Sequence, residues 1–201
     1  GACAPGQPAS VELFSAALIL CADHELNVSA FTARCVASAG STPYAVVIAG
    51  LAALQGHRHG GHTEGGGPPL RGANDGIAGA VASYLRQGAS IPGFGHRLYP
   101  DGDPRARLLL EMVNARYANA AIPALANELR RTVHALTGAQ PTVDFALEVM
   151  ARTLELPPHA ALALFALGRT IGWIGHAIEQ AATEQLIRPR ARYVGAQGRT
   201  L

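Results

Sequence analysis

Charged residues are scarce in this sequence, and so are apolar runs of the length that a membrane requires. Of the 201 residues, 15% are charged and 49% are hydrophobic. The longest candidate run, residues 16–21, is followed at once by Asp23, His24 and Glu25, whereas a bilayer-spanning helix takes about 20 apolar residues. The composition therefore predicts a globular, core-rich chain and gives no indication of a membrane partner.

Cysteine is also rare, and the overall charge is small. Cys3, Cys21 and Cys35 are an odd number at irregular spacing, which argues against a disulfide framework. Residues 1–10 lack the charged start and apolar stretch of a signal peptide, so we expect a reducing, cytoplasmic location. With a net charge of +2 and scattered arginines, nucleic acid is not an expected partner.

Strand patterns are missing as well, and the predicted fold class is all-α. Helix starts are marked by capping residues and by proline in the first turn, and helix ends by glycine. We expect helices over residues 10–39 (interrupted at 24–27), 43–54, 75–87, from 103 onward, 123–137, 143–154, 157–167 and 168–187. Because most of them are apolar on nearly every side, we also expect a thick helical body or a large subunit interface.

Three of the eight histidines, His57, His59 and His62, lie within six residues. Imidazole is a common transition-metal ligand, but no cysteine pair or H-E-x-x-H motif accompanies them. A polar loop with solvated histidines is the second interpretation. A neutral catalytic imidazole next to a glycine turn, where a ligand approaches the backbone, is the third. The pattern by itself leaves all three open.

A second polar region surrounds His96. Gly93 and Gly95 flank an aromatic residue just before it, which suits either a simple turn or a tight loop that holds a ligand against backbone amides. Arg105 stands at a predicted helix start, where the macrodipole disfavours a cation. A bound carboxylate would offset that cost through a bidentate pair.

Asp144 and Arg169 are further candidates for a site. Asp144 lies in the first turn of a predicted helix, where it either complements the helix dipole or acts as a base. Arg169 lies between the apolar segments 160–167 and 171–178, so it needs an anionic partner from the protein or from a dicarboxylic substrate. The polar run 23–27 serves either core hydrogen bonding or a site.

Taken in order, these features resemble the citrate synthase family over nearly the whole chain, from about residue 10 to residue 195. The resemblance rests on seven ordered motifs, at residues 22–29, 59–61, 92–99, 103–105, 143–145, 168–173 and 188–195. The spacing from His96 to Arg105 also agrees with the family pattern. Chains of this family are longer and have more helices before the segment that matches residue 10.

The resemblance implies a multi-helical fold with a large and a small lobe, and a homodimer. Residues 10–64 and 147–201 would form the large lobe, residues 65–146 the small lobe, and residues 1–9 a flexible segment. It also implies an acyltransferase of the tricarboxylic acid cycle type, which condenses acetyl-CoA or propionyl-CoA with oxaloacetate to citrate or 2-methylcitrate and CoA. We expect no permanently bound cofactor and no metal, because the acyl-CoA is a co-substrate.

The functional residues of the family fall on matching positions here. His59 would stabilise the enol of the acyl-CoA, Asp144 would remove the proton next to the thioester carbonyl, and His96 would polarise the ketone of oxaloacetate. Four residues are expected to hold oxaloacetate, the last of them in a neighbouring subunit's site: His24, Arg105, Arg169 and Arg188. The residues expected to lie against CoA are Pro92, Gly93, Phe94, Gly95 and Arg97. At Pro100 the family often has a basic residue that is useful for a CoA phosphate.

Two other functions compete with this one. The short chain and Pro100 favour a catalytically weak or inactive relative that binds dicarboxylates or CoA esters in a regulatory role. A helical metal-binding protein would use His57, His59 and His62. Release of CoA thiol, thermal stabilisation by ligand without turnover and metal analysis distinguish the three. The sequence does not decide between acetyl-CoA and propionyl-CoA.

Overall fold

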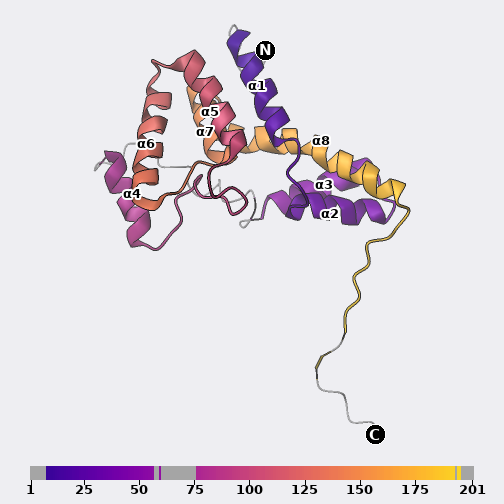
Figure 1. Ribbon diagram of the computed structural model, residues 1–201. Coiled ribbons are helices and arrows are strands. Elements are labelled where there is room, and N and C mark those ends of the chain that lie inside the picture. Colours follow the sequence, from indigo (N-terminus) through magenta and orange to yellow (C-terminus); the bar gives the residue numbers. More distant parts are fainter. Residues whose placement is uncertain (1–7, 57–58, 60–75, 193, 196–201) are drawn as a thin grey trace.

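The structure is a computed structural model that describes residues 8–56, 59, 76–192 and 194–195. That part of the chain is helical without strands (Figure 1), which confirms the expected all-α class. The helices are α1 (Pro8–Cys21), α2 (Val28–Ser38), α3 (Pro43–Leu54), α4 (Gly76–Arg86), α5 (Pro104–Tyr117), α6 (Ala121–Thr137), α7 (Val143–Thr153) and α8 (Ala160–Ala182). His57, His62 and the stretch 65–69 lie outside the described residues, as does most of the segment 1–9.

Local capping chemistry explains most of these boundaries. The side chains of Asn27, Thr42 and Asp103 accept hydrogen bonds from the first-turn amides of α2, α3 and α5, as capping residues do. Proline follows Thr42 and Asp103 in the first turn, where its missing N–H costs nothing. Gly138, with φ of 74°, ends α6 in the left-handed conformation that glycine adopts without strain.

The prediction of two helices over 157–167 and 168–187 was wrong, because α8 runs unbroken from Ala160 to Ala182. Gly168 does not interrupt the helix. A Cβ there would lie 2.8 Å from the Leu18 carbonyl oxygen, so glycine allows α1 to pack closely on α8. The helix ends five residues earlier than expected, and Glu184 adopts a φ of 54° just beyond it.

α8 also corrects the statement that no segment is long and apolar enough for a membrane. Its 23 residues meet that criterion by length and composition. In this fold α8 contacts α1, α2, α3 and α7, and the fully buried Trp173 lies at its centre, while only 17% of its apolar stretch is buried. The polar residues Arg169 and His176 divide its sequence into short apolar pieces, which is why a search for one uninterrupted run misses it.

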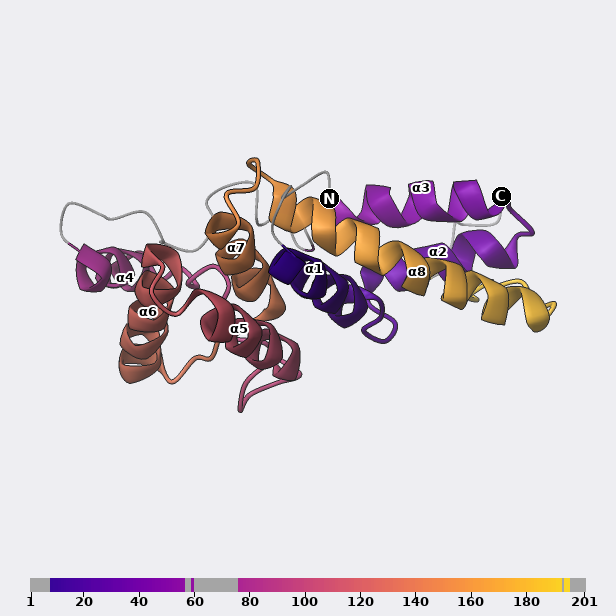
Figure 2. The same cartoon turned by 90° about the horizontal axis from the view of Figure 1, so that it is seen from above.

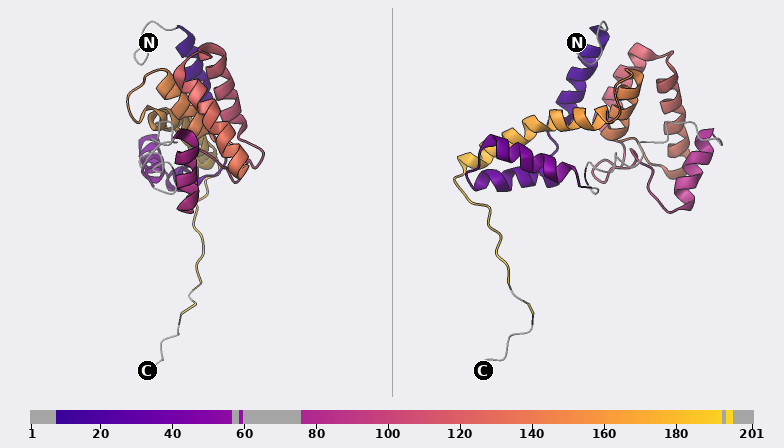
Figure 3. Two further views of the ribbon diagram at one scale, coloured as in Figure 1. Left: turned by 90° about the vertical axis from the view of Figure 1, so that its left-hand side faces the viewer. Right: turned by 180° about the vertical axis from the view of Figure 1, so that it is seen from behind.

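Two groups of helices lie on either side of the molecule, and α8 reaches both (Figures 1 and 2). One core joins α1, α4, α5, α6 and α7 with the start of α8. A smaller core joins α2, α3 and Trp173 of α8. Beyond α8 the described chain runs outward without helix, away from both groups (Figure 3). The expected lobe boundaries at residues 64 and 146 stay a prediction.

Candidate active site

A pocket of about 360 Å³ lies where the two groups of helices meet. It brings together side chains from six separate segments, among them the three predicted catalytic residues and three of the four predicted to hold oxaloacetate. The polar residues that line it are His24, Glu25, Asn27, His59, His96, Arg105, Asp144 and Arg169. Its apolar wall comes mainly from α7, α8 and the end of α3. The roles of these residues stay predictions, but their convergence on one pocket is a structural fact.

His24 enters the pocket from the segment 22–27, which connects α1 to α2. Its Nε2 lies 3.0 Å from the Tyr99 hydroxyl, and its ring meets the ring of His96 edge to face at 5.3 Å between centroids. The pKa of His24 is lowered from 6.5 by burial first and then by the positive charge of Arg105. His24 therefore faces a ligand as a neutral imidazole at pH 7.

His96 follows a loop that is tied to the start of α7. The Leu98 backbone N–H donates to Nδ1 of His96 over 3.2 Å. Since Nδ1 accepts this bond, a neutral His96 carries its proton on Nε2. That tautomer has an N–H available to donate to a ligand carbonyl.

His59 is anchored from α2. Its Nε2 lies 2.8 Å from the hydroxyl of the fully buried Ser29, and Ser29 in turn donates to the Asn27 side-chain oxygen over 2.8 Å. Burial first and the charge of Arg169 second lower the pKa of His59 from 6.5, while Asp144 opposes this. A neutral imidazole thus shares the pocket with a carboxyl group.

Asp144 stands in the first turn of α7. The hydroxyl of Thr142 caps no helix amide; it donates instead to Asp144 Oδ2 over 3.3 Å. The Asp144 side chain is exposed to the solvent of the pocket, and the protein atoms around the pocket desolvate it. This desolvation raises the pKa of Asp144 above 3.8, and the charge of Arg105 only partly offsets it. A carboxylate with a raised pKa is a stronger base than an ordinary one.

Arg105 has a carboxylate partner within the protein. It donates to both oxygens of Asp103, over 3.0 and 2.9 Å, and Asp103 also accepts the Val143 N–H. Burial alone would raise the pKa of Asp103, but the hydrogen bonds and charge of Arg105 hold it below its usual range. The cation at the helix start is therefore balanced by Asp103 itself, and not only by a ligand as the sequence suggested.

Arg169 is the least satisfied polar side chain of the pocket. It is 1% exposed, its Nε donates to the Cys21 carbonyl over 2.8 Å, and its guanidinium lies 4.9 Å from the Phe165 ring centre. Its Nη2 is buried and has no hydrogen-bond partner among the described residues. A buried charged donor without a partner is costly, so this atom indicates a binding position for an anion.

Other predicted residues do not line this pocket. Phe94 is buried against Phe145 at 4.8 Å between ring centres. Gly93 accepts from Thr142 N and Gly95 donates to Gln140 O, so these loop residues fix His96 beside α7. Pro92 lies in the same loop, Arg97 is exposed, and Arg188 is exposed in the segment after α8. The predicted contacts of Pro92, Gly93, Phe94, Gly95 and Arg97 with CoA, and of Arg188 with a second subunit, stay predictions.

A second pocket of about 460 Å³ adjoins the first, and Leu98 lines both. Pro100 and Asp101 form part of it, together with Arg107 from α5 and Arg130 from α6. Neither arginine has an ion pair among the described residues. Arg107, Arg130, Ser29 and Tyr99 are not among the residues predicted from the sequence to form the site. The only available signal for Ser29 and Tyr99 was their position inside the motifs.

Stability should fall as the pH drops from 7.5 to 5.5. The folded-state pKa values of His24 and His59 lie below 6.5, so below about pH 6.5 the unfolded chain binds protons that the folded chain does not. This favours unfolding. The raised pKa of Asp144 increases stability as the pH falls, but this is a single group, whereas two histidines decrease it. Thermal unfolding at both pH values should show a smaller loss for the H24N/H59N variant than for the wild type; equal losses would contradict the assignment.

Comparison with known proteins identifies the family. A sequence-family model described as "Citrate synthase, C-terminal domain" matches residues 4–190. The chain belongs to the citrate synthase family. Citrate synthase 2 of Bacillus subtilis is 37% identical over 194 residues, which are 94% of this chain and 52% of that protein. 2-Methylcitrate synthase 2 of Corynebacterium glutamicum is 32% identical over 197 residues, 96% of this chain and 51% of that protein.

Solved structures agree with this membership of the citrate synthase family. Citrate synthase of Thermotoga maritima matches with a TM-score of 0.80 and 30% identity, over 97% of this chain and 55% of that one. A citrate synthase of Thermoplasma acidophilum, solved as a ternary complex with carboxymethyl coenzyme A and oxaloacetate, matches with a TM-score of 0.72 and 26% identity, over 97% and 55%. The chain thus spans about half the length of these relatives.

Proposed function

We propose that the chain condenses an acyl-CoA, either acetyl-CoA or propionyl-CoA, with oxaloacetate, and releases CoA. The single observation that carries this proposal is the unpartnered Nη2 of Arg169 in a pocket that also holds a carboxyl group of raised pKa and a neutral imidazole. A dianionic acid supplies the missing acceptor for Arg169. The carboxylate and the imidazole are the base and the hydrogen-bond donor that enolisation of a thioester requires.

In the first step, Asp144 removes the α-proton of the acyl group. The C–H electron pair moves into a carbon–carbon double bond, and Nδ1–H of His59 donates to the oxygen that becomes negative. For this the Ser29 hydroxyl turns from Asn27 to His59 and donates to its Nε2. The raised pKa of Asp144 increases its basicity, and the lowered pKa of His59 keeps this donor neutral. The proton that leaves the substrate ends on the carboxyl group of Asp144.

In the second step, the enol carbon attacks the ketone carbon of oxaloacetate. His96 donates from Nε2 to the ketone oxygen, in the tautomer that Leu98 favours. Arg105, Arg169 and His24 hold the two carboxylates and so fix the ketone for attack. The proton taken up by Asp144 balances the one gained by the ketone oxygen, which becomes the hydroxyl of the product. Water then cleaves the thioester: its hydroxyl joins the acyl carbon and its remaining hydrogen joins the leaving sulfur, so that the products are citrate, or 2-methylcitrate, and the free thiol of CoA.

The second pocket supports a place for the nucleotide end of CoA. Pro100 occupies the position of a basic residue in the family pattern, but Arg107 and Arg130 line the same pocket and supply two positive charges. We assign them to the CoA phosphates. The pockets adjoin at Leu98, so one extended ligand can occupy both.

Replacing Arg107 by glutamine should therefore raise the KM for acetyl-CoA by about 10-fold, the effect of losing one charge-assisted hydrogen bond. The turnover number should stay unchanged, because the reacting atoms are in the other pocket. Steady-state kinetics measure both. The matched control is R86Q, since Arg86 is exposed on α4 and lines neither pocket. Equal KM values for R107Q and the wild type would remove Arg107 from the CoA site.

A homodimer in the cytoplasm completes the proposal. Large apolar side chains are exposed on two helices, with Tyr44 82% and Ile48 66% exposed on α3, and Ile171 71% and Ile178 66% exposed on α8. Exposed apolar surface of this extent favours association. In such a dimer Arg188, in the segment beyond α8, would reach the site of the second copy.

Release of CoA thiol tests the function directly. The chain is incubated with oxaloacetate and either acetyl-CoA or propionyl-CoA, and the substrate that gives faster release identifies the product. Thermal stabilisation by oxaloacetate is measured in parallel. Stabilisation without thiol release from either substrate would replace the catalytic proposal with the regulatory one. Absence of both would reject both.

A further inference from the structure

The segment 22–27 presents His24 to the pocket although it has no regular structure of its own. Glu25 within it adopts a φ of 55°, a conformation that L-residues seldom hold unless their surroundings require it. Something outside the segment must therefore fix its path. The contacts that do so come from α8.

The backbone of this segment crosses α8 directly at Gly172. A Cβ on Gly172 would lie 2.0 Å from the Ala22 carbonyl oxygen, so no other residue fits there without moving the segment. Arg169 lies three residues before Gly172 and His176 four residues after it, and these spacings place both side chains near the crossing. Arg169 holds the Cys21 carbonyl, whereas His176 Nε2 lies 3.0 Å from Asp23 Oδ1.

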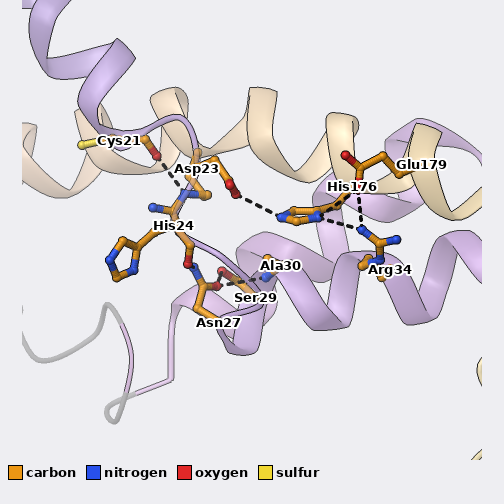
Figure 4. A network of polar contacts seen from close by, with 10 residues as sticks. Cys21, Asp23, His24, Asn27, Ser29, Ala30, Arg34, His176 and Glu179 are labelled. Atoms are coloured by element: carbon orange, nitrogen blue, oxygen red, sulfur yellow. Dashed lines mark hydrogen bonds and ion pairs between the residues drawn. The ribbon is translucent and has the colours of Figure 1, made fainter. Parts of the chain in front are cut away.

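His176 is oriented from its other side. Its Nδ1 lies 3.0 Å from Nη1 of Arg34 on α2, and a guanidinium can only donate. Nδ1 must therefore accept, which places the proton on Nε2, where it is donated to Asp23. Arg34 is held in turn by Glu179 over 2.7 Å. Figure 4 shows this chain of contacts, with Asp23 directed toward His176 and the ring of His24 directed away from it.

We propose that His176 is a positioning residue, which acts through Asp23 to hold His24 at the pocket. Only the expected consequence, weaker binding of oxaloacetate, depends on the proposed function. A purely structural tie between α2 and α8 is the competing explanation. Those helices already share the buried core around Trp173, and the bond to Asp23, whose side chain is 57% exposed, contributes little to stability. Loss of this bond should therefore free the segment without unfolding the protein.

The variants H176F and H176Q separate the two explanations. Phenylalanine keeps a ring but removes both nitrogen atoms. Glutamine can still accept from Arg34 and donate to Asp23. E179Q is the matched control on the same helix: it removes a charge beside His176, its amide oxygen can still accept from Arg34, and residue 179 does not contact the segment. D23A, which removes the acceptor at an exposed side chain, tests the same link from its other end should H176F fold poorly.

The first readout needs no substrate. The rings of His24 and His96 lie 5.3 Å apart, so histidine-labelled protein should give a nuclear Overhauser effect between them. We expect this signal in the wild type, H176Q and E179Q, and its loss in H176F and D23A. Retention of the signal in both H176F and D23A would overturn the proposal.

The second readout is affinity. H176F and D23A should bind oxaloacetate about 10-fold more weakly, a factor typical of one displaced hydrogen-bonding group. H176Q should stay within about threefold of the wild type, and the affinity for CoA should not change in any variant. A fall in both affinities together with a melting temperature lowered well below that of E179Q would favour the structural tie and reject positioning. A wild type that shows the ring signal but does not bind oxaloacetate would reject the proposed function, and the signal alone would then decide the role of His176.

Discussion

Replacing Asp144 by asparagine should lower the rate of CoA thiol release by about 10³-fold, within the range attributed to a positioned general base. Asparagine has nearly the same shape and can still accept from Thr142, but it cannot take the α-proton. The affinity for oxaloacetate should persist, because His24, Arg105 and Arg169 remain in place. Thiol release under saturating substrates and an oxaloacetate titration measure the two effects separately.

The same variant should be at least as stable as the wild type at pH 7. The pKa of Asp144 is raised in the folded protein, so the folded state disfavours its charge relative to the unfolded chain. That difference lowers stability at pH 7, where the unfolded carboxyl is fully ionised. A neutral amide removes this cost. A melting temperature that is unchanged or higher, combined with lost turnover, identifies a residue retained for chemistry and not for folding.

E148Q is the control for this variant. Glu148 lies one turn further along α7, pairs with Arg152 over 2.6 Å and does not line the pocket. The same chemical change at that position should leave thiol release unaffected. If D144N retained more than about a tenth of wild-type turnover, a loss far below the general-base range, Asp144 would not be the base.

The sequence predicted what is encoded locally. Thr42 and Asp103 mark helix starts that the sequence predicted, because each cap bonds to an amide two or three residues away. The family resemblance added the list of site residues, and His59, His96 and Asp144 do line one pocket. Both kinds of information are present in short, contiguous motifs.

What the sequence could not show depends on partners distant along the chain. Gly168 was taken as the start of a separate helix, because the Leu18 backbone that lies against it is not visible in the neighbouring sequence. The contact of Gly172 with the Ala22 carbonyl is hidden in the same way. The same holds for His176, whose contacts Asp23 and Arg34 are more than 100 residues away. Arg169 shows the limit most clearly, since a sequence reveals a buried arginine but not which of its nitrogen atoms lacks a partner.

The second large effect is expected for Arg169→Met, which removes this nitrogen atom. Methionine fills much of the same volume but removes the charge and the free Nη2. A hydrogen bond to a charged group contributes about 1.5–3 kcal/mol, so loss of the guanidinium should weaken oxaloacetate binding by about 10- to 100-fold. The acyl-CoA affinity should change little, because Arg107 and Arg130 lie in the other pocket.

Thermal unfolding reports this loss without any catalysis. Ligand at 100 times its Kd stabilises a protein by about 2.7 kcal/mol, which for a domain of this size raises the melting temperature by about 5–10 °C. Oxaloacetate should produce such a rise in the wild type and in the control R152M, whose arginine is paired with Glu148 outside the pocket. In R169M the same concentration of oxaloacetate should stabilise by only about 0.4–1.4 kcal/mol, so the rise should fall to about half or less. Arg169 also helps to lower the pKa of His59. R169M should therefore shift the acid limb of the pH–activity profile to higher pH. An unshifted acid limb, together with full stabilisation by oxaloacetate, would show that the anion binds elsewhere.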